Sequence, residues 1–245
     1  MKPILITGAE DTELNILLDK LENKKEDYIH GYNFYKGFFY NYPVIIVRTD
    51  VGIINATIST TIAIQEFDPC IVINQGTAGS HVLDFTRGDL VIAEKVAMMN
   101  SYVTPCKEGK MEVNALEWNI RTFADNKQII NTDEKLLNMA NLIQNEYLYG
   151  NIYNGVIASG DMFNRESKRI KWFNKKFDTV CEEMEGFAVY SVAEKFKVPV
   201  IGFRVISNNE LTGEKYDTKY GECSQEFTYC FVKRFINEYE KGFYN

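Results

Sequence analysis

Small and polar residues gather in five short clusters, each placed where a predicted strand ends. The clusters are residues 8–13, 75–79, 159–164, 182–185 and 204–208. They carry glutamates, an arginine and two asparagines, which can hold water, accept a proton and bind substrate hydroxyl groups. One cluster alone is weak evidence, because any strand-to-helix turn needs glycine and a capping residue. Their shared position at strand ends is what indicates a binding site.

The elements that would position these clusters alternate between short β-branched apolar runs and longer segments of helical spacing. The runs expected as strands are 3–7, 38–47, 70–74, 90–96, 156–158 and 198–206. The segments expected as helices are 14–21, 53–67, 134–147, 186–195 and 227–239. This order predicts an α/β fold, a three-layer αβα sandwich around a twisted mixed, largely parallel sheet. Residues 1–245 are expected to form a single domain.

Composition narrows the classes of partner. The 245 residues are 45% hydrophobic and 25% charged, which is an ordinary globular balance. The 34 acidic residues outnumber the 27 basic ones and give a formal net charge of -7. A polyanion would meet net repulsion, so neither nucleic acid nor a membrane surface is expected as a partner. No apolar run reaches the roughly 18 residues of a membrane span, and the run at 3–7 is too short for a signal peptide.

Cysteine and histidine usage indicates the cytoplasm and argues against metal chemistry. The five cysteines lack CxxC spacing and their odd number cannot pair completely, so reduced thiols are expected. The two histidines, His30 and His81, lie near neither a cysteine cluster nor each other. We therefore expect no metal site, no histidine-activated nucleophile and no cofactor. Gly8 does not begin a G-x-G-x-x-G fingerprint, which argues against a dinucleotide-dependent oxidoreductase.

Taken together and in this order, the clusters resemble the purine nucleoside phosphorylase/nucleosidase superfamily, and within it the 5'-methylthioadenosine/S-adenosylhomocysteine nucleosidases. The segments that carry the resemblance are Gly8-Ala9 with Glu13, INQGTAG at 73–79, SGDMF at 159–163, EMEG at 183–186 and RVIS at 204–207. The likeness runs from Ile4 to the C-terminal helix. It implies a nucleoside phosphorylase-like fold, a purine nucleosidase activity with water as co-substrate, and a homodimer.

The resemblance also implies catalytic roles. Glu13 matches the glutamate that positions the attacking water and accepts its proton, with Thr77 and Arg204 sharing that water. Glu13 could instead be a first-turn helix acid that the helix dipole stabilises. Arg204 could equally be a structural partner of Glu183 or Glu185, since a buried arginine must find a carboxylate.

Substrate-binding roles follow in the same way. Glu185 matches the glutamate that accepts hydrogen bonds from the ribose 2'- and 3'-hydroxyls, where it supports the developing ribosyl cation. Met184 would lie against the sugar, Phe163 would stack on the base and the backbone of Asn164 would contact the edge of the ring. Each of these side chains could otherwise belong to the core or to a helix terminus. The remaining residues expected at the substrate site are Ala78, Gly79, Glu183 and Ser207.

Asn208 departs from the family pattern. Nucleosidases for 6-aminopurines place there an aspartic acid that gives a proton to purine N7, and an amide cannot supply that proton. The amide oxygen could instead accept from N7–H of a departing 6-oxopurine while its nitrogen donates to O6. Asn208, counted with the catalytic residues, therefore favours inosine or guanosine over methylthioadenosine. Glu210 in the same loop could still provide an acid.

Two alternatives stay open. The related hexameric phosphorylases carry a Gly-Asp-Pro turn and an arginine directly before the aspartate of the next strand. Here Glu10 and Glu13 follow Gly8, and Gly88 precedes Asp89, so water is favoured over phosphate as nucleophile. A catalytically silent nucleoside-binding protein is the other alternative. Loops such as 100–110 are expected to form the pocket for the 5' substituent, which the sequence leaves undefined.

Overall fold

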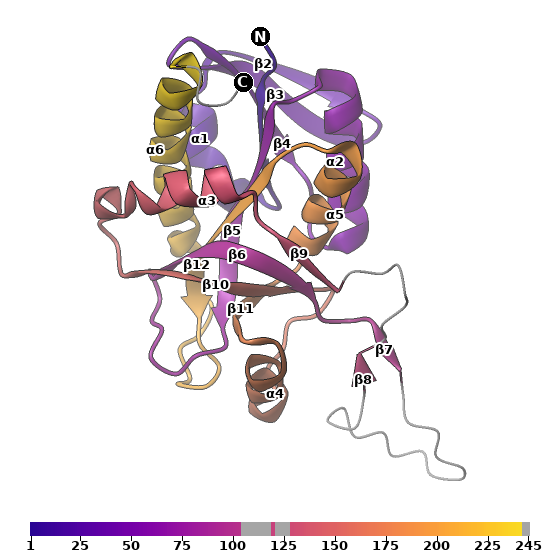
Figure 1. Ribbon diagram of the computed structural model, residues 1–245, viewed down its shortest axis with the longest axis vertical. Coiled ribbons are helices and arrows are strands. Elements are labelled where there is room, and N and C mark those ends of the chain that lie inside the picture. The colour runs from indigo at the N-terminus through magenta and orange to yellow at the C-terminus, as the bar shows by residue number, and fades with distance from the viewer. Residues whose placement is uncertain (104–118, 121–127, 242–245) are drawn as a thin grey trace.

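The computed structural model describes residues 1–103, 119–120 and 128–241, and one large mixed sheet lies at its centre (Figure 1). The strands of this sheet are β1 (Ile4–Gly8), β2 (Glu22–Ile29), β3 (Tyr32–Phe39), β4 (Tyr42–Arg48), β5 (Ile71–Ser80), β6 (Leu90–Met98), β9 (Ile129–Asn131), β10 (Ile152–Ser159), β11 (Thr179–Glu183) and β12 (Val200–Asn208). Their order is β11-β10-β6-β12-β5-β1-β4-β3-β2, with β9 beside β6. The short strands β7 (Tyr102–Val103) and β8 (Asn119–Ile120) pair separately.

Parallel strands bring the predicted clusters to one edge of the sheet. β1 pairs in parallel with β4 and with β5, and β12 pairs in parallel with β5. The far end of β5 also pairs antiparallel with β11, where Glu182 lies opposite Gly79. The row of strands from β11 to β5 therefore closes on itself, and the carboxyl ends of β1, β5, β11 and β12 surround one region.

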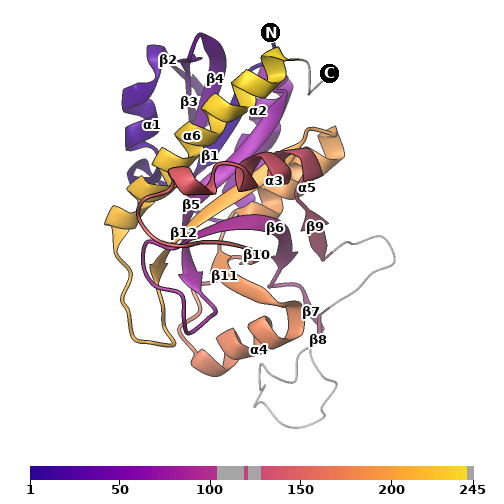
Figure 2. The same ribbon diagram turned by 60° about the vertical axis from the view of Figure 1, so that its left-hand side comes forward.

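Helices cover both faces of the sheet and confirm the three-layer α/β fold. The helices α2 (Ile53–Phe67) and α5 (Gly186–Phe196) pack on one face, where their alanines meet the β-branched residues of the strands. On the other face lie α1 (Asn15–Lys20), α3 (Glu134–Asn141) and α6 (Gly221–Glu240), and α6 contributes Phe227, Phe231 and Phe235 to that core (Figure 2). The helix α4 (Ser167–Phe177) packs at the β10–β11 end.

Some predicted boundaries were wrong. The run 38–47 is not one strand, because Tyr40 and Asn41 adopt positive φ angles of 51° and 63° and turn the chain from β3 into β4. The last helix begins at Gly221, six residues before the predicted start, and α3 ends at Asn141. The strand β2 and the helix α4 were not expected from the pattern.

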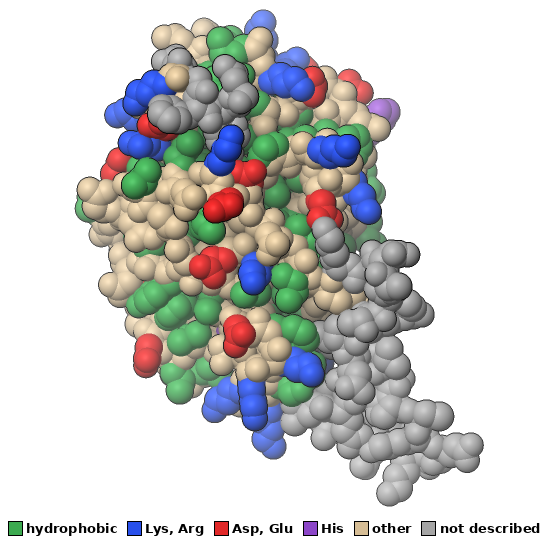
Figure 3. All heavy atoms as spheres, in the orientation of Figure 1, with side chains coloured by type: hydrophobic (Ala, Val, Ile, Leu, Met, Phe, Trp, Pro, Cys, Tyr) green, Lys and Arg blue, Asp and Glu red, His purple; other side chains and the backbone are tan. Residues whose placement is uncertain are grey.

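Charges of both signs are scattered over the face shown in Figure 3, with hydrophobic side chains between them. Among the helices of the described ranges, none is long and apolar enough to cross a membrane. Four cysteines lie in these ranges, and all four are free thiols. They are Cys70, Cys181, Cys223 and Cys230.

Candidate active site

A cavity of about 210 Å³ opens where the carboxyl ends of β1, β5, β11 and β12 converge. All five predicted clusters contribute to its wall. The lining residues are Ala9, Glu10, Glu13, Val51, Thr77, Ala78, Gly79, Met162, Phe163, Glu182, Glu183, Met184, Glu185, Ser207, Asn208 and Tyr216. Ten of the twelve predicted site residues are among them, and the other two, Arg204 and Asn164, lie buried behind the wall.

Glu13 is fixed by hydrogen bonds at the end of the short 3-10 turn η1 (Asp11–Glu13). Its Oε1 accepts from the backbone nitrogen of Thr77 at 2.7 Å and from the Thr77 hydroxyl at 3.1 Å. Its Oε2 accepts from the backbone nitrogen of Ala9 at 3.0 Å. The carboxylate passes directly over Gly76, where a Cβ would lie only 2.6 Å from Oε1. A buried carboxylate held in this way has lone pairs left to accept from a water in the cavity.

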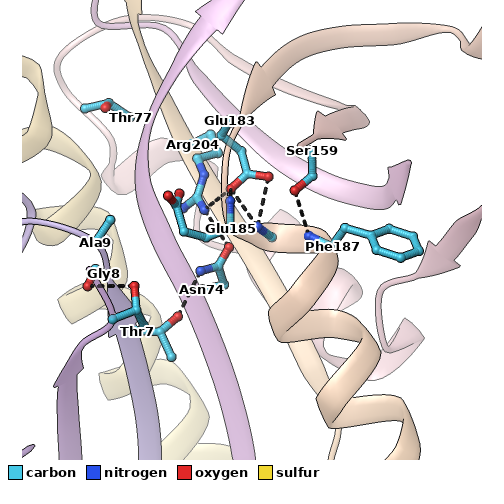
Figure 4. Close-up of polar contacts among 12 residues, drawn as sticks. Thr7, Gly8, Ala9, Asn74, Thr77, Ser159, Glu183, Glu185, Phe187 and Arg204 are labelled. Carbon is cyan, nitrogen blue, oxygen red and sulfur yellow. Dashed lines mark hydrogen bonds and ion pairs between the residues drawn. The ribbon is translucent and has the colours of Figure 1, made fainter. Parts of the chain in front are cut away.

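Arg204 belongs to a buried row of polar side chains that crosses four strands (Figure 4). Its Nη2 lies 2.5 Å from Oε2 of Glu183 and donates to Oδ1 of Asn74 at 2.6 Å. The amide nitrogen of Asn74 donates in turn to the Thr7 hydroxyl at 2.8 Å. Burial by itself would lower the pKa of Arg204, but Glu183 and the other carboxylates of the site outweigh it and raise that pKa. The structural role that the sequence allowed for Arg204 is therefore present, with Glu183 as the partner.

Glu183 is also committed to the start of α5. Its carboxylate accepts from the backbone nitrogens of Glu185 and Gly186 at 2.7–2.9 Å, and Ser159 Oγ accepts from that of Phe187 (Figure 4). An anion at the first turn of a helix satisfies orphan donors and complements the helix dipole. Glu183 thus lines the cavity with its oxygens already occupied by Arg204 and the helix.

Among the described residues Glu185 has no cation as a hydrogen-bond partner, although the charge of Arg204 acts on it and opposes the rise of its pKa. Its Oε1 accepts from the backbone nitrogen of Gly52 at 2.8 Å, and the side chain is buried. Gly52 is suited to this contact, because its φ is +100° and a Cβ there would meet Asp161 Oδ1 at 2.8 Å. Burial, followed by repulsion from Glu183, raises the pKa of Glu185 from 4.5 to about 8. The carboxyl group is therefore poised to change charge near neutral pH.

Asn208 lies at the end of β12, directly over Gly79 of β5. A Cβ at residue 79 would be 3.2 Å from the Asn208 amide nitrogen and 3.3 Å from its oxygen. The hydroxyl of Ser207 lies 3.3 Å from Asn208 Oδ1 and donates to the Ala78 carbonyl at 3.2 Å. The absence of a side chain at Gly79 leaves the amide group of Asn208 in the wall of the cavity.

Phe163 and Asn164 point in different directions. Phe163 is half exposed and lines the cavity, as stacking on a base would require. Asn164 is buried, and its backbone nitrogen donates to Glu182 Oε1 at 2.8 Å. The backbone of Asn164, which was expected to contact the edge of the base, therefore has its N–H bonded to Glu182. Met184 lines the cavity between the two glutamates that flank it in sequence.

Six lining residues are not among the twelve predicted site residues, namely Ala9, Glu10, Val51, Met162, Glu182 and Tyr216. Glu182 belongs to a recognised cluster but precedes the EMEG segment, and Val51 follows β4 without a motif. Tyr216 lies in the loop after β12, and it interacts with the Thr77 side chain. Burial raises the pKa of Tyr216, so its hydroxyl stays protonated at neutral pH. Among the described residues, no group of three or more His, Cys, Asp or Glu side chains could hold a metal ion. Most of the loop 100–110 lies outside the described residues.

Comparison with known proteins shows the family. Residues 3–237 match the model described as the Phosphorylase superfamily, so the chain belongs to that superfamily. It is 30% identical over 218 residues to the 5'-methylthioadenosine/S-adenosylhomocysteine nucleosidase of Geobacillus sp. strain WCH70, with 89% of each chain covered. A mutant of this nucleosidase from Helicobacter pylori, with 5'-methylthioadenosine in its active site, has 28% identity and a TM-score of 0.80 over 97% of this chain and 99% of that one. The futalosine hydrolase of Helicobacter pylori has 27% identity and a TM-score of 0.79, with 97% and 98% covered.

Proposed function

We propose that this member of the phosphorylase superfamily hydrolyses the N-glycosidic bond of a purine nucleoside whose base is a 6-oxopurine, as in inosine or guanosine. The observation that carries the proposal is the placement of two buried carboxylates, Glu13 and Glu185, in one cavity with the amide of Asn208. The relatives above are named for cleavage of different nucleosides, so the choice of base rests on the residues of this chain.

The proposed reaction needs only water and these side chains. As the bond between C1' and N9 breaks, its electron pair leaves with the base, and the ribose carries positive charge. Glu185, once ionised, would accept hydrogen bonds from the ribose 2'- and 3'-hydroxyls and support that charge. A water held by Glu13 and Thr77 would attack C1', and its proton would pass to Glu13. The departing base would take up a proton from solvent at N7, and Glu13 would return the proton of the attacking water to solvent. Asn208 would accept from this N7–H and donate to O6 of the base.

The charge of the cavity favours water over phosphate. Its described lining contains five glutamates and neither lysine nor arginine, and the positive charge of Arg204 is paired with Glu183. A phosphate dianion would have to enter against these carboxylates without a cation to receive it. We expect purine release to proceed equally well with and without phosphate and to yield free ribose. A requirement for phosphate, with ribose 1-phosphate as product, would contradict the proposal.

A nucleoside-binding protein without activity would not need a carboxylate that is held in place beside Thr77. The test is purine release by the purified protein, followed over time with inosine as substrate. We expect Glu13→Gln to lower the rate at least a hundredfold, because an amide is not a base. Glu66→Gln, the same change at an exposed position of α2, serves as the matched control. Nucleoside binding without release by the unaltered protein would favour the binding alternative.

The choice of base has its own test. We expect kcat/KM for inosine or guanosine to exceed that for 5'-methylthioadenosine, because the Asn208 amide complements O6 and N7–H and has no proton to give to N7 of adenine. The three nucleosides are compared under the same conditions by separating the released base. Efficient cleavage of 5'-methylthioadenosine alone would overturn the assignment of the base.

We also propose that two copies of the chain associate near the cavity. Ile54 and Ile58, one turn apart on α2, are 70% and 44% exposed, and Val51 of the cavity wall precedes them. Sedimentation of the protein is expected to give the mass of a dimer, and Ile58→Asp to shift it toward the monomer. Observation of a monomer at micromolar concentration would contradict this.

The free thiols of the described residues support the proposal that the protein acts in the cytoplasm.

A further inference from the structure

Glu182 in the wall of the cavity forms a buried hydrogen bond with His81, and the proposed reaction uses neither side chain. His81 Nε2 lies 2.9 Å from Glu182 Oε2, and His81 Nδ1 lies 2.8 Å from the Thr179 hydroxyl. Both His81 and Glu182 are buried. A carboxylate can only accept, so the N–H at His81 Nε2 is assigned as the donor of this hydrogen bond and Glu182 Oε2 as its acceptor. The imidazole thereby holds the carboxylate of Glu182 in place.

Asn164 holds the same carboxylate from a second side. Its amide nitrogen donates to Glu182 Oε2 at 2.5 Å, and its backbone nitrogen donates to Oε1 at 2.8 Å. A carboxylate offers about four acceptor positions, two on each oxygen. His81 and Asn164 occupy both positions of Oε2 and one of Oε1. One position on Oε1 is left, on a residue that lines the cavity.

Strand register places Glu182 and Asn208 on either side of Gly79. Glu182 of β11 is the partner of Gly79 in the antiparallel pairing, and Asn208 of β12 is its partner in the parallel one. Neighbouring strands are separated by about 4.8 Å, so the two backbones stand roughly 10 Å apart with a glycine between them. Both side chains line the cavity, and the amide of Asn208 lies over Gly79, where a Cβ would be 3.2 Å from the amide nitrogen.

We propose that Glu182, held by His81 and Asn164, accepts a hydrogen bond from N1–H of the bound purine and so selects 6-oxopurines. Hypoxanthine and guanine carry a proton on N1, and guanine adds a 2-amino donor beside it. Adenine presents a lone pair at N1, which would face the Glu182 carboxylate and be repelled. Asn208 would read the N7 and O6 side of the ring while Glu182 reads the N1 side. This rests on the proposed function, and it names the edge of the base that the site recognises.

The test compares inosine with 1-methylinosine, in which a methyl group replaces the N1 proton. We expect the unaltered protein to prefer inosine at least tenfold in kcat/KM, since the methyl group removes the donor and meets the carboxylate. Glu182→Ala removes the acceptor and makes room for the methyl group, so the preference is expected to fall to within about threefold. If Glu182 only holds Asn164 in place, Glu182→Ala would lower kcat/KM for both nucleosides equally. An unchanged ratio of the two values would therefore overturn the proposal.

Controls separate this proposal from the function on which it rests. Glu66→Ala, on the exposed side of α2, is expected to keep the ratio of the unaltered protein. If neither nucleoside is hydrolysed, the proposed function fails. The role of Glu182 is then still tested by the ratio of the dissociation constants of inosine and 1-methylinosine, measured by titration calorimetry. If Glu182→Ala does not fold, Glu182→Gln is expected to lower kcat/KM for inosine at least tenfold and not that for adenosine. A loss confined to adenosine would show that Glu182 donates rather than accepts, and would overturn the proposal.

Discussion

Arg204 Nη2 lies 2.5 Å from Glu183 Oε2, and the same carboxylate caps the first turn of α5 through the backbone nitrogens of Glu185 and Gly186. One ion pair thus fixes the sheet to the helix that presents Glu185 to the cavity. Glu183 pairs with the guanidinium group, whereas Glu185 accepts from the backbone nitrogen of Gly52. Burial and repulsion from Glu183 raise the pKa of Glu185 to about 8.

Removal of the Arg204 charge should destabilise the fold strongly. In Arg204→Met the buried Glu183 carboxylate would lose its cation next to Glu185, and such a change costs about 3–5 kcal/mol of unfolding free energy. Urea denaturation measures the loss. The double variant Arg204→Met with Glu183→Gln should recover part of it, because the uncompensated charge is gone. Arg87→Met is the control, since this arginine is about one-third exposed and should cost less than about 1 kcal/mol. Equal losses for the two arginines would contradict the proposed role of the pair.

The raised pKa of Glu185 predicts a pH-dependent stability. Burial raises this pKa from 4.5 to about 8, so the folded state holds a proton that the unfolded chain releases. The stability from this group is fully present below pH 4.5 and is lost as the pH rises through about 8. Relative to Glu185→Gln, which cannot ionise, the unaltered protein should lose about 2 kcal/mol or more between pH 5 and pH 9. Denaturation at several pH values measures this difference, and a constant difference would contradict the shift.

The activity should also depend on the ionisation of Glu185, but it should rise with pH where the stability falls. Only the ionised Glu185 can accept from both ribose hydroxyls, so kcat/KM should rise with pH until about pH 8 and then level off. Below that point the slope should approach tenfold per pH unit for a single required deprotonation. Glu185→Gln should lose most of the activity and also this limb of the profile. A profile that is flat from pH 6 to pH 9 would show that the ionisation of Glu185 does not control the reaction.

The sequence predicted the layers of the fold well but not its edge. Buried strands such as β1 and β5 begin with the apolar runs 4–6 and 71–73, which makes them recognisable. The strand β2 reads ENKKEDYI and is mostly exposed, because it pairs only with β3 at the edge of the sheet. Its charged side chains protect the open edge of the sheet. They also replace the alternation of apolar and polar residues by which a strand is recognised in a sequence. Tertiary pairing, which no local pattern reports, holds it in place.

The candidate site, too, could be predicted only in part from the sequence. Motif residues such as Glu13 and Glu185 could be found, because their clusters follow buried strands. Tyr216 reaches the cavity only through the conformation of the loop that follows β12, with a bridge between Asn209 and Glu214 at its base. The role of Glu182 depends on His81, which lies 101 positions away in the chain. Contacts of this kind are set by register between distant strands, and one sequence does not report them.

Gly76 should be required for activity more than for stability. A Cβ at this position would lie 2.6 Å from Glu13 Oε1 and would displace the carboxylate. We expect Gly76→Ala to lower kcat/KM about a hundredfold, as a misplacement near 1 Å does at a reacting centre. The control is Gly31→Ala at the β2–β3 turn, where φ is +94° but a Cβ would meet nothing within 4 Å. That variant should cost about 1 kcal/mol of stability and leave activity unchanged. Full activity in Gly76→Ala would show that Glu13 need not be fixed.

In the proposed function the amide of Asn208 selects the base, so Asn208→Asp should change the preference among bases. A carboxyl group at this position can give a proton to N7 of adenine, and it loses the amide hydrogen that donates to O6 of a 6-oxopurine. The ratio of kcat/KM for 5'-methylthioadenosine to that for inosine should therefore rise at least tenfold. Asn23→Asp, the same change at an exposed position of β2, should leave the ratio unchanged. Because Asn208 lies over Gly79 in the wall of the cavity, an unchanged ratio in Asn208→Asp would mean that the base does not reach this side of the site.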